Sequence, residues 1–289
     1  MKQTLTALLC LALLACGSDR QEATPAVADK DYSERMAQEN RADRTVASPA
    51  TRQELKIPIH SQSVVYGKAG GRDIEGYLAY PADAEGGLPA VLVIHEWWGL
   101  NDNIRAMADR LAAEGYAALA VDLYGGQVAS QPDAAQALMQ AALANQAGLS
   151  TNLRQAYGFL ADEIKAARIG TIGWCFGGSM SLKAGLELGD RLDAVVVYYG
   201  HVDGDANRLK TLQAPLLGLF GGADQGIPVE SVRAFESALK AGGKSAEIHI
   251  YDGAGHAFAN PSGTHYKADA AEDAWQRAIG FLAANLKNG

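Results

Sequence analysis

The sequence predicts an α/β protein with a mostly parallel central sheet and helices on both faces. From about Ser61 onward, short apolar runs alternate with longer amphipathic runs, which is the order of strands joined by crossover helices. Most of the short runs are apolar without interruption, as expected of strands that are buried on both faces. With 48% apolar and 20% charged residues among 289, the chain can build a sizeable core and is unlike a disordered protein.

The N-terminal residues are typical of an export signal. Lys2 precedes an apolar run over residues 4–15, which is too short for a membrane span of about 20 residues. The string Leu13-Leu14-Ala15-Cys16 resembles a bacterial lipoprotein signal, and the resemblance implies a signal peptide over residues 1–15 and several acyl chains on Cys16. By the same resemblance, Gly and Ser at positions 17 and 18 favour the periplasmic face of the outer membrane over the inner membrane. An ordinary signal peptide cut nearby is the alternative.

Residues 16–60 are interpreted as a lipidated N-terminus and a polar tether. Charges are mixed in this stretch, and aromatic and β-branched residues are few. Within it, residues 31–44 could instead form a solvated helix packed on the domain, because charge patterning does not exclude one. The folded domain is expected over residues 61–289.

The domain is expected to open with a hairpin that contains residues 64–66 and 73–80 and turns at residues 68–72. The further strand candidates are residues 90–94, 117–121, 169–173, 194–199, 215–220 and 247–251. Helices are predicted over residues 104–114, 133–165 as a pair, 178–188, 229–241 and 268–286. Gly115 ends the first of these helices and Gly242 ends the helix over 229–241, whose first turn suits Pro228. Ligands of such sheets bind beyond the carboxyl ends of the strands, so the residues there are candidates for chemistry.

Charge and motifs exclude several classes of function. The net charge of -8 argues against a nucleic-acid partner, since phosphate contacts need clustered Lys and Arg. No G-x-x-x-x-G-K-[ST], G-x-G-x-x-G or H-E-x-x-H motif occurs, so we expect neither a nucleotide cofactor nor a metal. The cysteines are Cys10, Cys16 and Cys175, which leaves the domain without a disulfide framework.

Gly173-Trp174-Cys175-Phe176-Gly177 follows a predicted strand and opens a predicted helix. This is the setting of the G-x-S-x-G nucleophile turn, with cysteine in place of serine. Glycine is needed on both sides because Cβ atoms there would collide with neighbouring backbone. The helix N-terminus favours a Cys175 thiolate, and the Phe176 N–H would point toward a developing oxyanion. Taken alone, Cys175 could equally be a buried structural cysteine.

Asp224 and His256 supply the partners that such a nucleophile needs. Each follows a later predicted strand through a glycine-rich loop, and the chain order nucleophile, acid, base is that of the same layout. The intervals between them are long enough for a strand and a helix in each. The histidines expected to have surface or packing roles are His60, His201, His249 and His265.

His95 and Glu96 end a predicted strand at the same sheet edge, where the loop with a second oxyanion donor would lie. A carboxylate is repelled by a thiolate, so Glu96 could take the thiol proton, the two groups sharing one proton. The alternative for Glu96 is an ordinary surface glutamate.

Together these segments resemble the dienelactone hydrolase family of α/β-hydrolases. The likeness covers approximately residues 61–289. It rests on His95-Glu96-Trp97-Trp98-Gly99, Asp122-Leu123-Tyr124, Gly173-Trp174-Cys175-Phe176-Gly177-Gly178, Asp224, and residues 251–258.

The resemblance implies an α/β-hydrolase fold and a role for each matching residue. It implies that Cys175 attacks a lactone or ester carbonyl, that His256 acts as general base and acid, and that Asp224 orients this histidine. It also implies that Glu96 takes the thiol proton when substrate binds. The remaining implied site groups are the oxyanion-hole N–H groups of Trp97 and Phe176 and the side chain of Tyr124.

Two departures from the family bear on the substrate. Members that cleave dienelactone carry an arginine four residues after the catalytic histidine, where this chain has Asn260. Another arginine, expected after Tyr124, has no counterpart between Gln127 and Asn152. The neutral amide of asparagine cannot replace the two charge-assisted hydrogen bonds through which an arginine guanidinium binds a carboxylate. We therefore expect a substrate without an essential carboxylate, with Asn260 at its binding site.

The sequence thus predicts a monomeric, cofactor-independent hydrolase of small esters or lactones, anchored by lipid in the bacterial cell envelope. It would form an acyl-thioester on Cys175. A non-catalytic envelope binding protein on the same fold is the alternative, since a fold alone does not prove activity. A thiol peroxidase is a further alternative, which the lack of a resolving cysteine in the domain disfavours.

Overall fold

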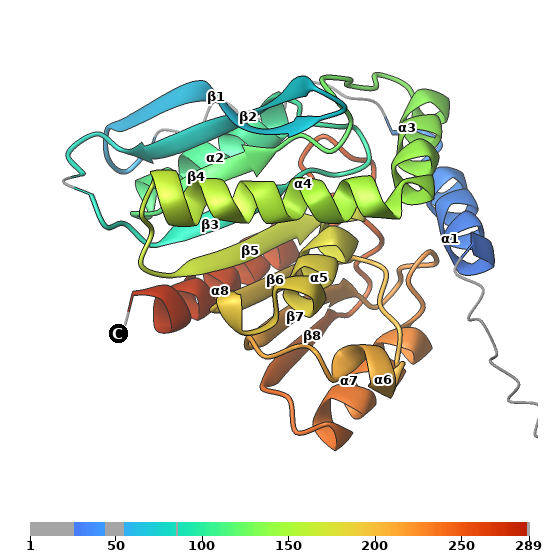
Figure 1. Ribbon diagram of the computed structural model, residues 1–289. Coiled ribbons are helices and arrows are strands. Elements are labelled where there is room, and N and C mark those ends of the chain that lie inside the picture. The colour runs from blue at the N-terminus through green and yellow to red at the C-terminus, as the bar shows by residue number, and fades with distance from the viewer. Residues whose placement is uncertain (1–25, 44–54, 85, 288–289) are drawn as a thin grey trace, which may run out of the picture.

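The computed structural model describes residues 26–43, 55–84 and 86–287. Its centre is an eight-stranded sheet in the order β1-β2-β4-β3-β5-β6-β7-β8 (Figure 1). β1 (Ile59–Ala69) and β2 (Arg72–Pro81) form an antiparallel hairpin, and β2 also pairs antiparallel with β4. The parallel strands are β3 (Ala90–Ile94), β4 (Ala117–Val121), β5 (Ile169–Trp174), β6 (Ala194–Tyr198), β7 (Leu216–Gly221) and β8 (Ala246–Tyr251). The predicted fold class is confirmed.

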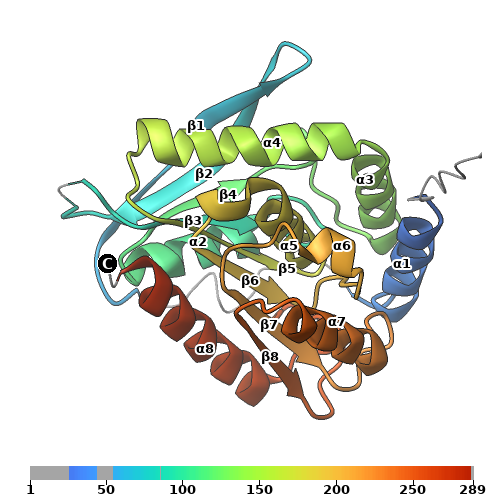
Figure 2. The ribbon, with the colours of Figure 1, turned by 60° about the horizontal axis from the view of Figure 1, so that its bottom comes forward.

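Helices cover both faces of this sheet (Figure 2). One face carries α2 (Asp102–Ala113) and α8 (Ala268–Leu286), and the other carries α4 (Gln146–Gly158), α5 (Phe176–Leu188) and α7 (Val229–Ala241). The domain also contains α3 (Pro132–Ala144), the short α6 (Ala206–Leu209) and single turns at Phe159–Glu163 and Gly189–Arg191. Because both faces are covered, every residue of strands β3 to β7 is buried. This burial is the reason for their uninterrupted apolar runs.

The predicted elements lie close to the observed ones. β3 and β4 have the predicted bounds. β5, β6 and β8 differ by one residue at one end, and β7 is shifted by one residue at both ends. The hairpin is longer than predicted, since β1 begins at Ile59, and α5 begins at Phe176, directly after the predicted nucleophile.

The N-terminal helix α1 (Ala26–Glu39) corrects the interpretation of residues 16–60 as a tether. Tyr32 and Met36 are 1% and 0% exposed, and the helix lies beside α3 (Figure 1). Because side chains four residues apart share one face of a helix, these two apolar groups bury the same face of α1 against the domain. The alternative of a packed helix within residues 31–44 describes this segment better.

The predicted signal peptide and the lipidation site Cys16 lie outside the described residues. Within the described ranges, no helix combines the length and apolar character needed to cross a membrane.

Candidate active site

Cys175 lies at the sharp turn between β5 and α5. Its φ of 56° and ψ of -119° lie outside the regions that non-glycine residues ordinarily adopt. A Cβ atom on Gly173 would overlap the carbonyl group of Gly177, and one on Gly177 would overlap the carbonyl oxygen of Ile94. Only glycine therefore lets the turn pack this closely against the end of β3. The Cys175 N–H donates to the Tyr198 carbonyl oxygen at 3.0 Å, which holds the strained residue against β6.

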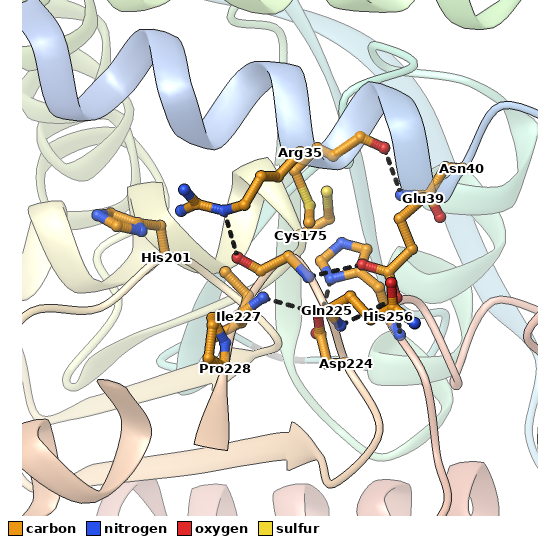
Figure 3. Close-up of polar contacts among 12 residues, drawn as sticks. Arg35, Glu39, Asn40, Cys175, His201, Asp224, Gln225, Ile227, Pro228 and His256 are labelled. Carbon is orange, nitrogen blue, oxygen red and sulfur yellow. Dashed lines mark hydrogen bonds and ion pairs between the residues drawn. The ribbon is translucent and has the colours of Figure 1, made fainter. Parts of the chain in front are cut away.

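Asp224 and His256 come from the loops after β7 and β8, and the structure brings both to Cys175 (Figure 3). His256 Nδ1 lies 2.8 Å from Asp224 Oδ2, and both side chains are fully buried. The second carboxylate oxygen of Asp224 accepts a hydrogen bond from the Ile227 N–H at 2.7 Å. Both oxygens of Asp224 are therefore engaged, and the bond to Nδ1 leaves His256 Nε2 available for proton transfer.

The charges around His256 favour its protonated form. Burial by itself would lower the pKa of His256, but the charges of Asp224 and of a Cys175 thiolate raise this pKa well above its usual value. The ring of Tyr199 lies edge-on to the imidazole, with ring centroids 5.2 Å apart. The site thus favours an imidazolium at His256, buried away from water.

Glu96 is buried, contrary to the alternative of a surface glutamate. Its Oε2 atom accepts a hydrogen bond from Asn260 Nδ2 at 2.8 Å. Burial raises the pKa of Glu96 to about 7; the positive charge of His256 opposes this shift and the charge of Asp43 adds to it. A carboxyl group with such a pKa can take up or release a proton near neutral pH. Asn260, predicted as a substrate-binding residue, is in contact with this carboxyl group.

His95 holds the turn that presents Glu96. Its Nε2 atom accepts from the Leu123 N–H at 3.1 Å, so the proton is on Nδ1, which donates to the Glu96 carbonyl oxygen at 2.6 Å. Burial lowers the pKa of His95, which keeps the ring neutral. His95 therefore has a supporting role in the loop.

The raised pKa of Glu96 predicts a pH-dependent loss of stability. Between pH 4.5 and about 7 the folded protein keeps a proton on Glu96 that the unfolded chain releases. The free energy of unfolding should therefore fall by about 3 kcal/mol as the pH rises through this window. Glu96→Gln should lack this loss, since the amide oxygen can still accept from Asn260.

The measurement is urea unfolding at pH 4.5 and pH 8 for the wild type and Glu96→Gln. The matched control is Glu75→Gln, which removes a carboxylate from an exposed position. A wild-type pH dependence that Glu96→Gln reproduces would contradict the prediction.

The two predicted oxyanion donors are both available. Among the described residues, neither the Trp97 N–H nor the Phe176 N–H has a hydrogen-bond acceptor. Phe176 is the first residue of α5, where N–H groups have no partner within the helix. Trp97 lies in the turn closed by the hydrogen bond from the Gly99 N–H to the Glu96 carbonyl oxygen, 3.3 Å long. These donors suit a negatively charged oxygen formed next to Cys175.

Tyr124 also lies at this edge of the sheet. Its ring centroid is 4.6 Å from that of His95 and 5.5 Å from that of Phe176. The hydroxyl group is buried without a hydrogen-bond partner among the described residues. Burial, followed by the charge of Cys175, raises the pKa of Tyr124 well above its usual value.

The sequence analysis missed the contribution of α1 to this site. Figure 3 shows α1 passing across Cys175, Asp224 and His256, with Glu39 pointing toward the loops of the last two. The signal for it was the spacing of Tyr32, Met36 and Glu39, at positions i, i+4 and i+7, which places them on one helix face.

A sequence model described as the dienelactone hydrolase family matches residues 74–286. A protein of Methylorubrum extorquens, named a proposed carboxymethylenebutenolidase, is 33% identical over 278 residues, covering 86% of this chain and 95% of that protein.

Two solved structures are also similar to this chain. A proposed dienelactone hydrolase from Klebsiella pneumoniae is 30% identical, with a TM-score of 0.70, covering 78% of this chain and 99% of its own. A dienelactone hydrolase-like promiscuous phosphotriesterase from metagenomic libraries has a TM-score of 0.72. It is 24% identical and covers 78% of this chain and 98% of its own, so it supports the shared fold alone.

Proposed function

This chain belongs to the dienelactone hydrolase family, and we propose that it hydrolyses small esters or lactones without a cofactor, through an acyl-thioester on Cys175. The observation that carries the proposal is the buried His256–Asp224 pair, 2.8 Å apart, beside a cysteine at a strained turn. A reactive cysteine needs a nearby positive charge and an N–H pair for the oxyanion, and both are present here. The name of the Methylorubrum relative, which describes a lactone hydrolase, supports the substrate class.

In the proposed acylation, Glu96 accepts the thiol proton and the Cys175 thiolate attacks the carbonyl carbon. The negative charge on the carbonyl oxygen is held by the N–H groups of Trp97 and Phe176. The intermediate then expels the alkoxide, which takes a proton from His256 Nε2, and Cys175 is left as a thioester. Asp224 keeps the imidazole oriented throughout.

In the proposed deacylation, neutral His256 takes a proton from water as the water oxygen attacks the thioester carbonyl carbon. The second intermediate breaks its carbon–sulfur bond. The carboxylic acid leaves, and His256 is again an imidazolium. Glu96 then returns its proton to the Cys175 thiolate, which restores the starting state.

The test is to compare initial rates on a short aryl ester and on dienelactone. Asn260 stands where family members that cleave dienelactone have an arginine for the substrate carboxylate. We therefore expect the short aryl ester to be hydrolysed about 10- to 100-fold faster than dienelactone, because dienelactone lacks a charge-assisted hydrogen bond that contributes about 1.5–3 kcal/mol. Equal or faster turnover of dienelactone would overturn the substrate inference. Binding of either compound without any turnover would favour the alternative, a non-catalytic envelope binding protein.

We also propose that Cys16 is lipidated and anchors the protein in the bacterial cell envelope, on the periplasmic face of the outer membrane. The Leu13-Leu14-Ala15-Cys16 string supports this proposal. Expressed in a bacterium with two membranes, the wild type should sediment with the outer membrane and Cys16→Ser should be released. Equal distribution of the two proteins would contradict it.

A further inference from the structure

The proposed nucleophile is closed off from solvent. Cys175 is 3% exposed, His256 is 0% exposed and Glu96 is 5% exposed. Five prominent cavities formed by the described residues are lined by neither Cys175 nor His256. A substrate cannot reach the sulfur unless part of the protein moves. The segment in the way is α1, which lies outside the residues matched by the family model and passes across the site (Figure 3).

Tyr32 is the α1 side chain that packs beside the turn at Cys175. It is 1% exposed, and its ring centroid lies 5.0 Å from that of His201. Burial, and then the charge of a Cys175 thiolate, raise the pKa of Tyr32 well above its usual value, while a Ser179 hydroxyl contact lowers it. The His201 N–H donates to the Ser179 hydroxyl at 2.8 Å, and this hydroxyl donates to the Cys175 carbonyl oxygen at 3.5 Å, so Tyr32 packs beside the turn of the proposed nucleophile. Among the described residues the Tyr32 hydroxyl has no well-formed hydrogen bond. A buried hydroxyl without a bond is costly, so this contact is a weak point of the docked helix.

The C-terminal end of α1 is docked much more firmly. Both carboxylate oxygens of Glu39 accept backbone hydrogen bonds, from the N–H groups of Gln225 at 3.3 Å, Gly226 at 2.7 Å and His256 at 3.3 Å. These N–H groups belong to the two loops that carry the predicted acid and base. Just after the helix, Asp43 Oδ1 accepts from the Thr264 N–H at 2.8 Å and from its hydroxyl at 2.6 Å.

Glu39 also lies close to the side chains of Asp224 and His256, whose loops it holds. A carboxylate oxygen of Glu39, a carboxylate oxygen of Asp224 and a ring nitrogen of His256 all lie within 4.8 Å of one another. Since backbone N–H groups already engage both oxygens of Glu39, the carboxylate fixes the relative position of the two loops.

We propose that α1 is the lid of the active site, with Glu39 as a positioning residue at its hinge end and Tyr32 as the group that substrate must displace. The contacts of Glu39 and Asp43 stay in place and hold the loops of Asp224 and His256 in register. The half of the helix that carries Tyr32 moves away from Cys175 and returns when the product leaves. Opening and closing of α1 therefore control the access of substrate to Cys175, and α1 lies outside the residues that the family model matches. The catalytic part of this inference rests on the proposed function.

The lid is tested by the rate at which iodoacetamide alkylates Cys175 in the full chain, read on the Cys175 peptide by mass spectrometry. We expect Tyr32→Ala to be alkylated about ten-fold faster than the wild type, because reaction of a buried group is limited by local opening. Tyr32→Phe keeps the ring and should react within about two-fold of the wild type, since shielding is by the ring. Gln38→Ala, on the exposed face of α1, is the matched control.

Alkylation does not require turnover, so this result separates the lid from the proposed function. Equal alkylation rates for the wild type and Tyr32→Ala overturn the lid even if ester hydrolysis depends on Cys175. Faster alkylation of Tyr32→Ala supports the lid even if no ester is hydrolysed.

The positioning role is tested by Glu39→Gln. An amide offers one acceptor oxygen and turns an NH2 group toward a backbone N–H, so the two loops lose part of their support. We expect kcat for a short aryl ester to fall about ten-fold with little change in KM, the pattern of a misplaced reacting group. Glu34→Gln makes the same charge change on the exposed face of α1 and should keep the wild-type kcat. An unchanged kcat in Glu39→Gln, or an equal loss in Glu34→Gln, overturns the positioning role.

Discussion

Replacing Cys175 with alanine is expected to lower kcat/KM for a short aryl ester by at least about 10⁴-fold, because loss of a nucleophile removes the covalent route altogether. In the proposed mechanism the Cys175 thiol is the group on which His256 Nε2 and the two predicted oxyanion donors act. Without it, His256 could at best activate water that is held in no defined position. The variant should still fold, because Cys175→Ala removes a single sulfur atom from the turn.

The measurement is a full rate profile for the wild type, Cys175→Ala and Cys175→Ser. Mass spectrometry of the acid-quenched wild type should show an acyl group on the Cys175 peptide. If Cys175→Ala kept more than about a tenth of the wild-type kcat/KM, a covalent route through this residue would be excluded. Thermal unfolding of each variant serves as the control for folding.

Replacing Asp224 with asparagine is expected to lower kcat/KM by about 10⁴-fold near pH 7, because an amide can hold the imidazole in the wrong tautomer. The oxygen of the new amide can still accept from the Ile227 N–H, so the loop should keep its shape. Its NH2 group would donate to His256 Nδ1 and move the ring proton to Nε2, where a base is needed. Asp224 is also the strongest of the influences that raise the pKa of His256, so this pKa should fall in the variant.

The loss of rate is measured from the dependence of kcat/KM on pH, and the fall in the His256 pKa is measured by NMR. In Asp224→Asn the titration of His256, followed by NMR of the ring, should move to lower pH. Asp252→Asn makes the same charge change in the neighbouring loop after β8, at an exposed position, and should keep the wild-type profile. A small loss of rate in Asp224→Asn, or a similar loss in Asp252→Asn, would show that Asp224 does not orient the histidine.

The lipid anchor and the lid involve neighbouring parts of the chain. Cys16 precedes α1 by ten residues, because α1 begins at Ala26. If both proposals hold, the lid is tied to the membrane surface by this short connection. Comparing the alkylation rates of Cys175 in membrane-bound wild type and in released Cys16→Ser would then show whether anchoring changes lid opening.

The sequence by itself determined the sheet, the turn at Cys175 and the chain order of the predicted acid and base. Strands buried on both faces must be apolar throughout, so β3 to β7 were visible as runs. The turn at Cys175 was visible because close backbone packing admits only glycine at Gly173 and Gly177. These features constrain residue types within short stretches of the chain, so local sequence predicts them.

Only the tertiary structure decided the environment of Glu96 and the place of α1. The pKa of Glu96 depends on burial beside Asn260 and on the charge of His256, groups that are more than 150 residues away in the chain. The docking of α1 depends on Glu39 accepting hydrogen bonds from backbone N–H groups, which every residue but proline has and which therefore leave no pattern in the sequence. A polar segment with two apolar anchors resembles a tether until the surface that receives it has formed.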